Sequence, residues 1–325
     1  MKNYRILAWL VLLVSMTVLC CAGAENPWTD EQWEKLNQQL SNDNADAAIE
    51  TEWLEFDHQD LSEAEGLDEN WMHILLLGVD NPKIDGPITG RSDAMLILSV
   101  NQETGEARLS SIVRDLYVQL PLIGWPNRIN AAYVFGGPYY TMKTVNETFG
   151  LNIRKYCTID LRGFTSVVDL LGGVEIELSE GETVEINNDR NVETPVGRGL
   201  QKLNGQQALS YVRLRATDNN FGRNERQRKF LVSMMQAVLS QHDIGDMLDI
   251  AEMLLSHMET NLTAADTMKL IFSFLPKLNT LETYSCPQSG EYRFVTTEQG
   301  AEVVEAIDIG QVAKNLKAFI YGSAE

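Results

Sequence analysis

The sequence predicts an α/β fold built on a mixed central sheet, and three observations support this prediction. Residues 73–80 form a short apolar run with a glycine near its end, as a buried strand does, and residues 94–100 form a second such run. Residues 107–113 follow a turn over residues 101–105, so they are expected to pair with the second run as a hairpin. Beyond residue 139, helical and extended patterns alternate. A hairpin followed by such alternation is typical of the α/β class.

The remaining elements are predicted from apolar spacing and capping residues. Extended patterns predict strands over residues 156–161, 174–178 and 292–296. Helical spacing predicts helices over residues 139–149, 164–171, 204–213, 224–241, 245–257, 264–278 and 309–321. Asn204 is a suitable N-cap for the third of these helices, and Gly172 with Gly173 ends the second.

The N-terminus carries a membrane-targeting signal. Lys2 and Arg5 precede a continuous apolar run over residues 6–21, and Ala22-Gly23-Ala24 follows it as a small-x-small sequence. The run of about 16 residues is intermediate in length between a signal-peptide core and a spanning helix. We therefore expect either cleavage after Ala24 or retention of residues 1–24 as an anchor. Residues 25–70 are sharply acidic and are expected to form a stalk with short helical pieces.

The overall charge narrows the class of partner. The 325 residues include 46 acidic residues against 26 Lys and Arg, a formal net charge of -20. This surplus repels nucleic acid, so DNA binding is disfavoured. The apolar content of 44% is enough for an ordinary hydrophobic core.

Two cysteines, Cys157 and Cys286, lie outside the N-terminal segment. An oxidising compartment would permit a disulfide between them. The alternative is a pair of buried thiols, and the sequence leaves both possibilities open.

Positive charge is concentrated in one stretch of this acidic chain. Residues 198–229 contain only two acids, Asp218 and Glu225, and eight bases: Arg198, Lys202, Arg213, Arg215, Arg223, Arg226, Arg228 and Lys229. A guanidinium group makes forked, two-point contacts with phosphate oxygens, so this cluster indicates a phosphorylated ligand. The alternative is that some of these basic residues are ordinary surface charges.

Two further clusters lie upstream, each at the end of an expected strand. Arg91 and Asp93 precede the second strand, and Arg114 and Asp115 follow the third. Carboxylate oxygens suit Mg²⁺, which takes one or two protein carboxylates together with water and phosphate oxygens. The alternative for each cluster is a local salt bridge. No nucleophile elbow, P-loop or zinc-type spacing is present, so metal-assisted phosphoryl chemistry is the reaction class that the sequence favours.

Seven segments, taken in order along the chain, carry a resemblance to a known protein family. They are residues 73–80 (HILLLGVD), 90–100 (GRSDAMLILSV), 111–115 (SIVRD), 128–137 (RINAAYVFGG), 168–178 (VDLLGGVEIEL), 203–215 (LNGQQALSYVRLR) and 221–230 (FGRNERQRKF). Together they resemble the LytR-CpsA-Psr family of cell-envelope proteins. The resemblance implies one three-layer α/β/α domain with a central mixed sheet behind an N-terminal membrane anchor. We therefore expect a domain over residues 71–325, with a core over 72–241 and a C-terminal helical extension over 242–325.

The resemblance also implies an activity. Family members transfer a glycopolymer linked to undecaprenyl pyrophosphate, such as teichoic acid, capsule or another secondary wall polymer, to a hydroxyl of peptidoglycan. They act on the outer side of the cell membrane with a single-pass anchor, which favours retention of the anchor here over secretion after cleavage. The expected cofactor is Mg²⁺, and the expected partners are the lipid-linked glycan, the peptidoglycan acceptor and the membrane, with no nucleic acid.

The site residues are assigned from the resemblance by position. Asp93 and Asp115 would hold Mg²⁺, and the pyrophosphate would be bound by Arg91, Arg114, Arg213, Arg215, Arg223, Arg226 and Gln227. Of these residues, Asp93, Arg114, Arg213 and Arg215 would also act in catalysis. The acid that commonly precedes the Phe-Gly-Arg motif is Asn220 in this chain, and Asn cannot serve as a general base. Asp218 is therefore the candidate base.

Two alternatives share the same residues. The first is a lipid pyrophosphatase, in which water replaces the hydroxyl acceptor. The second is a binding protein with a regulatory, attenuator-type role in the cell envelope, for which the presence of Asn220 leaves room.

Overall fold

The computed structural model describes residues 57–79, 88, 90–123, 125–214, 220–239, 258–263, 266, 281–297 and 300–322. The membrane segment expected over residues 1–24, most of the acidic stalk and the helix expected over residues 245–257 lie outside these ranges. So does all but Asp266 of the helix expected over residues 264–278. In the parts of the chain that the structure describes, no helix is both long and apolar enough to span a membrane.

A six-stranded sheet in the order β10-β3-β2-β1-β6-β9 forms the centre of the domain. Its strands are β1 (Trp71–Val79), β2 (Ser92–Asn101), β3 (Ala107–Ile112), β6 (Lys155–Asp160), β9 (Met258–Thr260) and β10 (Glu282–Cys286). β2 is antiparallel to both β1 and β3, whereas β6 is parallel to β1 and β10 is parallel to β3. The expected mixed sheet is confirmed.

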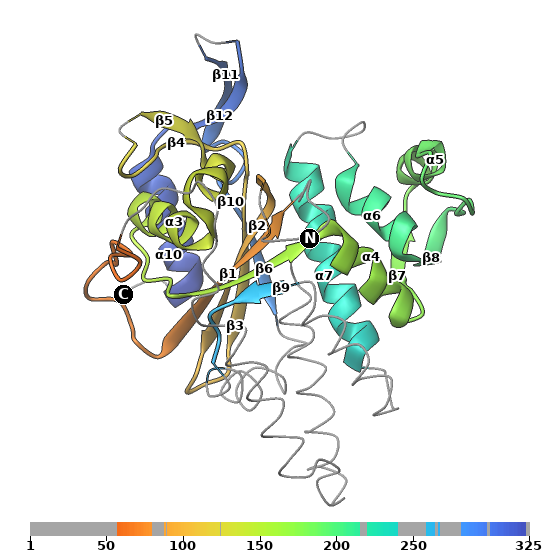
Figure 1. Ribbon diagram of the computed structural model, residues 1–325, viewed down its shortest axis with the longest axis horizontal. Coiled ribbons are helices and arrows are strands. Elements are labelled where there is room, and N and C mark those ends of the chain that lie inside the picture. The colour runs from red at the N-terminus through yellow and green to blue at the C-terminus, as the bar shows by residue number, and fades with distance from the viewer. Residues whose placement is uncertain are drawn as a thin grey trace, which may run out of the picture.

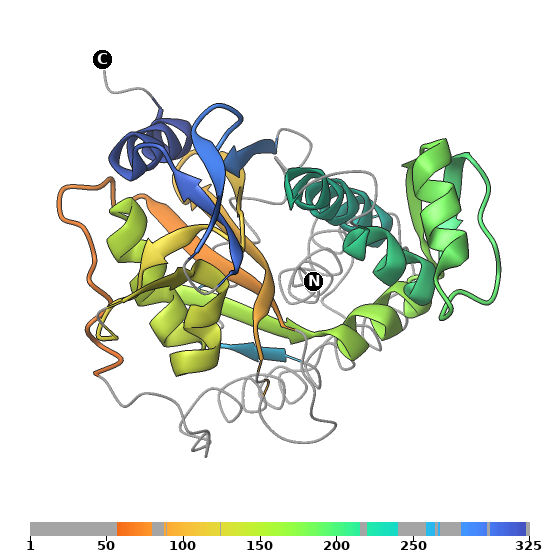
Figure 2. The ribbon, with the colours of Figure 1, turned by 90° about the horizontal axis from the view of Figure 1, so that it is seen from above.

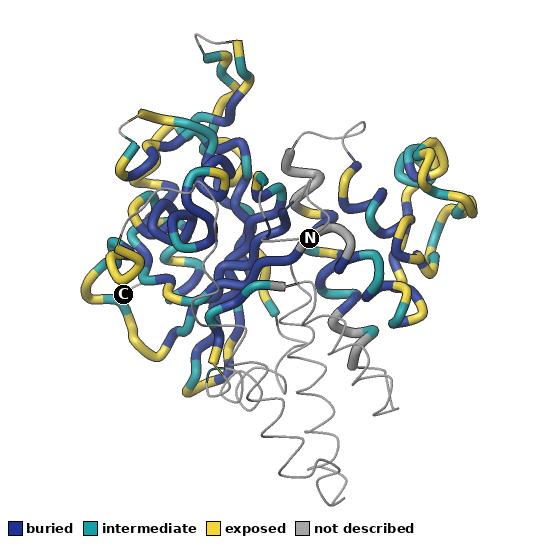
Figure 3. The backbone as a smooth tube through the Cα atoms, viewed as in Figure 1, coloured by how far each residue is buried: buried dark blue, intermediate teal, exposed yellow. Residues whose placement is uncertain are grey.

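Helices cover both faces of this sheet (Figures 1 and 2). One face carries α3 (Ala132–Phe149) and α10 (Ile309–Tyr321), and the other carries α4 (Leu161–Leu170), α6 (Gly205–Arg213) and α7 (Asn220–Leu239). Side chains of β1 alternate between the two cores, with Leu75 and Leu77 in the first and Ile74 and Leu76 in the second. The continuous apolar run of β1 therefore reflects burial on both faces of the sheet, visible as the dark band in Figure 3.

Three two-stranded antiparallel sheets accompany the central sheet. They are β4 (Tyr117–Gln119) with β5 (Pro126–Arg128), β7 (Val174–Leu178) with β8 (Gly199–Leu203), and β11 (Tyr292–Thr296) with β12 (Glu302–Ala306). The short 3-10 helix η1 (Ile129–Ala131) leads from β5 into α3, and α5 (Glu180–Asn188) follows β7. Leu116, directly before β4, also forms a parallel bridge with Val304 of β12. The hairpins β4–β5 and β11–β12 thus lie against each other (Figure 1).

Two expectations require correction. The C-terminal part is not a helical extension in its described residues, because it supplies β9 and β10, the two edge strands of the central sheet, in addition to α10. The helix expected to begin at residue 139 begins at Ala132 instead. Gly136 and Gly137 interrupt it with non-helical dihedral angles, including φ +61° at Gly137, a conformation that glycine adopts readily.

The two cysteines are free and buried. Cys157 on β6 belongs to the core beneath α4, α6 and α7, whereas Cys286 on β10 belongs to the opposite core. Three strands separate β6 from β10 in the sheet, so the two sulfur atoms are too far apart for a disulfide. The alternative of two buried thiols is the one that the structure supports.

Candidate active site

The upstream charged clusters meet at one edge of the central sheet. Parallel pairing places the carboxyl ends of β3 and β10 at the same edge, and the antiparallel partner β2 begins there. Leu96 of β2 lies opposite Ser111 of β3. Carrying this register three residues further places Asp93 opposite Arg114. Hairpin geometry therefore brings together two residues that lie in separate motifs of the sequence.

Arg114 connects two carboxylates at this edge. Its Nη1 donates a hydrogen bond to Oδ1 of Asp93, and its Nε lies 3.3 Å from Oδ2 of Asp115. The side chains of Arg114 and Asp115 are 11% and 12% exposed, whereas that of Asp93 is 34% exposed. Asp93 is therefore the carboxylate that solvent or a ligand reaches more readily.

A second arginine, Arg128, faces Asp115 from the end of β5. Its Nε lies 3.4 Å from Oδ1 of Asp115, and its Nη2 donates to the carbonyl oxygen of Glu302 at 2.6 Å. The backbone of Asp115 is held as well, because its carbonyl oxygen accepts a hydrogen bond from Val304 N at 2.9 Å. Asp115 is thus enclosed by two guanidinium groups and by β12. The sequence assignment missed Arg128, although it is the first residue of one matching segment.

Asn130 lies behind these charges. Its backbone N–H donates to the carbonyl oxygen of Arg114 at 3.2 Å, and its own carbonyl oxygen accepts from Ser92 Oγ at 3.4 Å. Asn130 and Ser92 are both buried. These contacts lock η1 to the ends of β2 and β3, so the backbone that carries Arg114 is fixed from two sides.

The second basic cluster lies on α6 and α7. Arg213 is exposed in the last turn of α6. Arg226 is buried instead, with its Nη2 donating to the carbonyl oxygen of Leu214 at 2.8 Å and its Nη1 lying 3.8 Å from Oε1 of Glu182. Gln227 is also buried and donates to the carbonyl oxygen of Val212 at 3.5 Å. Arg226 and Gln227 therefore tie α7 to the end of α6, a positioning role that satisfies helix-terminal carbonyl groups.

One contact relates α7 to the sheet edge. Arg228 donates a hydrogen bond to Oγ of Ser111, which lies three residues before Arg114. Burial lowers the pKa of Arg228 from its usual value. The first half of α7 therefore crosses the end of β3. This arrangement brings the basic helix to the edge that carries Arg114.

The other assigned residues are only partly described. Arg91 is exposed directly before β2, next to Gly90 at φ +127°. Arg215 and Asp218 lie outside the described residues. Asn220 and Arg223 belong to the first turns of α7, but their side chains lie outside the described part of the structure.

The donor set suits Mg²⁺ in one respect. Among the described residues, no group of three or more His, Cys, Asp and Glu side chains forms a complete metal cage. Mg²⁺ does not require such a cage, since it binds through one or two carboxylates and completes its shell with water and phosphate oxygens. Asp93, the more exposed carboxylate, fits this requirement. Asp115 fits it less well, because arginine nitrogens already face both of its oxygens.

Comparisons with known proteins agree with the resemblance found in the sequence. The model of the LytR_cpsA_psr family matches residues 32–317. The chain is 34% identical over 229 residues to a protein of Oceanobacillus iheyensis named polyisoprenyl-teichoic acid–peptidoglycan teichoic acid transferase TagU, with 68% of each chain covered. It is 30% identical over 245 residues to a protein of the same name from Enterococcus faecalis, covering 74% of this chain and 78% of that one.

Solved structures support the fold. The crystal structure of Bacillus subtilis TagV is similar with a TM-score of 0.62 and 26% identity, covering 79% of this chain and all of that one. A structure described as TagT bound to LIIa-WTA has a TM-score of 0.63 and 24% identity, covering 79% of this chain and 92% of that one. At that identity, the likeness to TagT is evidence for the fold alone.

Proposed function

Because the chain belongs to the LytR_cpsA_psr family, we propose that it is a transferase that moves a polyprenyl-pyrophosphate-linked glycopolymer onto a hydroxyl group of peptidoglycan. The names of its relatives from Oceanobacillus iheyensis and Enterococcus faecalis support teichoic acid as the polymer class. In the proposed reaction the hydroxyl oxygen attacks the phosphorus atom next to the sugar. The phosphoanhydride bond breaks, and lipid phosphate leaves.

One observation carries the proposal: Arg114 lies between Asp93 and Asp115 at the sheet edge that the basic helix α7 crosses. A departing lipid phosphate gains negative charge as the anhydride bond breaks. Preorganised guanidinium groups stabilise such charge where it develops. Because two carboxylates hold Arg114, its orientation is set before the substrate arrives.

The remaining residues divide into binding and positioning roles. Arg91 and Arg213, both exposed, are proposed to contact the pyrophosphate oxygens, and Arg215 and Arg223 are proposed to join them. Arg226 and Gln227 would hold α6 and α7 in place for this contact.

Mg²⁺ is the proposed cofactor, with Asp93 as its more accessible carboxylate ligand and Asp115 as the second. When bound, it would neutralise charge on the pyrophosphate oxygens. Asp218 is the proposed general base, which would accept the proton of the attacking hydroxyl. We also propose that residues 1–24 anchor the domain to the outer side of the cell membrane.

The test uses the full chain in lipid nanodiscs, a synthetic polyprenyl-pyrophosphate oligosaccharide and peptidoglycan fragments. We expect glycan on peptidoglycan only when Mg²⁺ is present, and a loss of at least about 100-fold in Asp93→Asn. Glu175→Gln is the matched control, since it removes one exposed carboxylate charge from β7. Release of lipid phosphate without transfer would identify a pyrophosphatase. Tight binding without turnover would identify a regulatory binding protein.

A further inference from the structure

Helix α5 begins with a capping box, and one glutamate of this box also faces a buried arginine. Oε2 of Glu182 accepts hydrogen bonds from the backbone N–H of Ser179 at 2.9 Å and from its hydroxyl at 2.8 Å. The hydroxyl of Ser179 in turn accepts from the backbone N–H of Glu182 at 3.3 Å. This reciprocal arrangement satisfies two backbone N–H groups at the start of the helix. It engages Oε2 of Glu182 and leaves Oε1 for a second contact.

This second contact is an ion pair with Arg226 of α7. Oε1 of Glu182 lies 3.8 Å from Nη1 of Arg226. The side chains of Glu182 and Arg226 are 14% and 5% exposed, so water screens their attraction only weakly. At 3.8 Å the contact is too long for a hydrogen bond and acts through charge. It links α5 to α7 through the interior of the domain.

Arg226 extends this link to the end of α6. Its Nη2 donates to the carbonyl oxygen of Leu214 at 2.8 Å, and Leu214 is the C-cap of α6. The backbone leaves the helical conformation at Leu214, with φ -50° and ψ +135°, so its carbonyl oxygen needs a partner from outside the helix. Arg213, proposed above to contact the pyrophosphate, is the residue directly before Leu214. The Arg226 guanidinium therefore fixes the backbone from which the side chain of Arg213 projects.

The other end of α5 carries an acid that faces α6. Asp189, the C-cap of α5, accepts a hydrogen bond from the backbone N–H of Asn191 at 2.9 Å. This bond lowers the pKa of Asp189 from its usual value, and the hydroxyl of Ser210 and the positive charge of Arg213 lower it further. Helix α5 therefore presents one carboxylate to each of the two arginine-bearing helices, Glu182 to α7 and Asp189 to α6.

The sign of its effect on anion binding separates two roles for Glu182. A carboxylate near an anion site repels the anion, so on charge alone its removal should strengthen binding. A carboxylate that holds the arginine framework should have the opposite effect. Arg226 is buried and keeps its proton, so without Glu182 its charge loses a partner inside the domain, and the contacts of Arg226 with α6 should weaken.

We propose that Glu182 is a positioning residue of the pyrophosphate site, which holds Arg226 and thereby fixes the end of α6 that carries Arg213. The inference rests on the proposed function, because it names a residue that supports the proposed contact between Arg213 and the pyrophosphate. Glu182 lies in none of the seven segments that carry the family resemblance, so its role follows from the folded domain. It acts through Arg226 and touches neither the substrate nor the metal ion.

The first test measures binding of inorganic pyrophosphate to the full chain in lipid nanodiscs by isothermal titration calorimetry, with Mg²⁺ present. Glu182→Gln is the informative variant, because Gln can replace Glu in a capping box but carries no charge to pair with Arg226. We expect Kd to rise about 10-fold, as for the loss of about one charge-assisted contact. Partial unfolding would lower the fraction of binding sites and not change Kd. An unchanged or lower Kd would overturn the proposal.

Glu180→Gln is the matched control, since Glu180 is an exposed acid in the same first turn of α5. It removes the same charge without touching the pair with Arg226, so Kd should stay at the wild-type value or fall slightly. Equal weakening of pyrophosphate binding by the two substitutions would also overturn the proposal.

A double-mutant cycle gives a second readout that needs no ligand. Glu182→Gln should lower Tm by at least about 4 °C in the wild-type background, but by less than about 2 °C in an Arg226→Gln background, where its partner is already absent. Equal losses in the two backgrounds would show that Glu182 does not act through Arg226 and would overturn the proposal. If the wild type binds no pyrophosphate, the proposed function fails, and the cycle alone decides whether Glu182 holds Arg226.

Discussion

Replacing each site carboxylate by its amide should separate a structural role from a ligand-binding one. Asp115 has a side chain that is 12% exposed and lies 3.3 and 3.4 Å from two guanidinium nitrogens. Removing one partner of a buried ion pair costs about 3–5 kcal/mol. Because Arg128 is 28% exposed, we take the lower end of this range, about 3 kcal/mol, for Asp115→Asn. For a domain of this size that loss lowers Tm by about 6–12 °C.

Asp93→Asn should behave differently. The side chain of Asp93 is 34% exposed and pairs with Arg114 alone among the described ion pairs. An exposed pair contributes about 1 kcal/mol or less, so Tm should fall by no more than about 4 °C. If Asp93 holds Mg²⁺, the variant should also lose the increase in Tm that Mg²⁺ produces in the wild type.

The assay for both variants is thermal unfolding of the full chain with and without Mg²⁺, followed by circular dichroism. Equal Tm losses would contradict the distinction between the two carboxylates. An Asp115→Asn variant as stable as the wild type would contradict the buried ion-pair role of Asp115. Either result would show that the arginine contacts of Asp115 do not govern its function.

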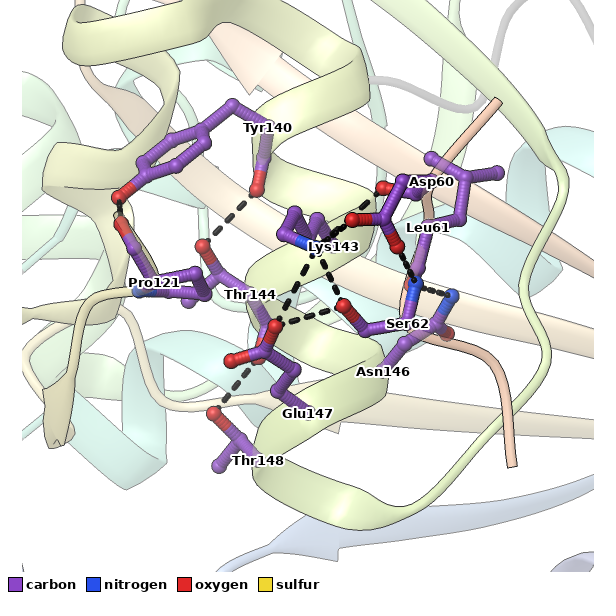
Figure 4. A network of polar contacts seen from close by, with 10 residues as sticks. All are labelled: Asp60, Leu61, Ser62, Pro121, Tyr140, Lys143, Thr144, Asn146, Glu147 and Thr148. Carbon is purple, nitrogen blue, oxygen red and sulfur yellow. Dashed lines mark hydrogen bonds and ion pairs between the residues drawn. The ribbon is translucent and has the colours of Figure 1, made fainter. Parts of the chain in front are cut away.

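Three further predictions concern stability. Gly205→Ala should lower the free energy of unfolding, measured in urea, by about 3 kcal/mol, because the added Cβ would lie 2.3 Å from a carbonyl oxygen of α4. Gly197→Ala is the control: its Cβ meets only ordinary contacts, so the free energy of unfolding should change by less than about 0.5 kcal/mol. Burial lowers the pKa of His73 to about 4, so below about pH 6.5 the unfolded chain binds a proton that the folded chain excludes. The free energy of unfolding should therefore fall by about 3 kcal/mol as the pH drops from about 6.5 to about 4. His73→Gln should make this fall smaller. Lys143→Met removes the ion pair with Asp60 (Figure 4) and should therefore speed proteolytic cleavage within residues 57–63, with the cleavage sites identified by mass spectrometry. An unchanged cleavage rate would show that the Lys143 contacts do not hold these residues in place.

The elements that the sequence predicted are those with a strong local signal. β1 and β2 are buried on both faces, so their residues form continuous apolar runs. α10 carries apolar residues at helical spacing and is capped by Asp308. For such elements, local pattern and tertiary environment agree, and their boundaries fall within a few residues of those expected.

Two of the strands that were not predicted, β9 and β10, lack such a signal. β9 contains only three residues, and β10 has a mixed pattern of polar and buried positions at the sheet edge, where one side of the strand pairs with no other described strand. The pairing of β10 with β3 joins residues far apart in the chain, so no local window contains the information. Arg128 was not assigned to the site because its contacts with Asp115 and with the carbonyl oxygen of Glu302 arise only in the folded domain.

The contact between Asp93 and Arg114 could have been predicted from the sequence, although the two residues were assigned to separate clusters. Position along the chain groups Arg91 with Asp93 and Arg114 with Asp115. The hairpin that pairs Val100 with Ala107 fixes a register in which Asp93 faces Arg114 across β2 and β3. Cross-strand geometry therefore joins the two motifs into one site, with Arg114 shared between them.

The surroundings of Asp115 show why the site needs the whole domain. Val113, two residues earlier, donates its N–H to the carbonyl oxygen of Cys286 on β10 at 2.9 Å, and Val304 on β12 donates to the carbonyl oxygen of Asp115 itself. Arg128 adds a side-chain link to the carbonyl oxygen of Glu302. The backbone that presents Arg114 is thus hydrogen-bonded on one side by strands from the last fifty residues of the chain. A chain ending near residue 241 would lose these partners and expose the core beneath α10, so the catalytic edge and the C-terminal strands must form together.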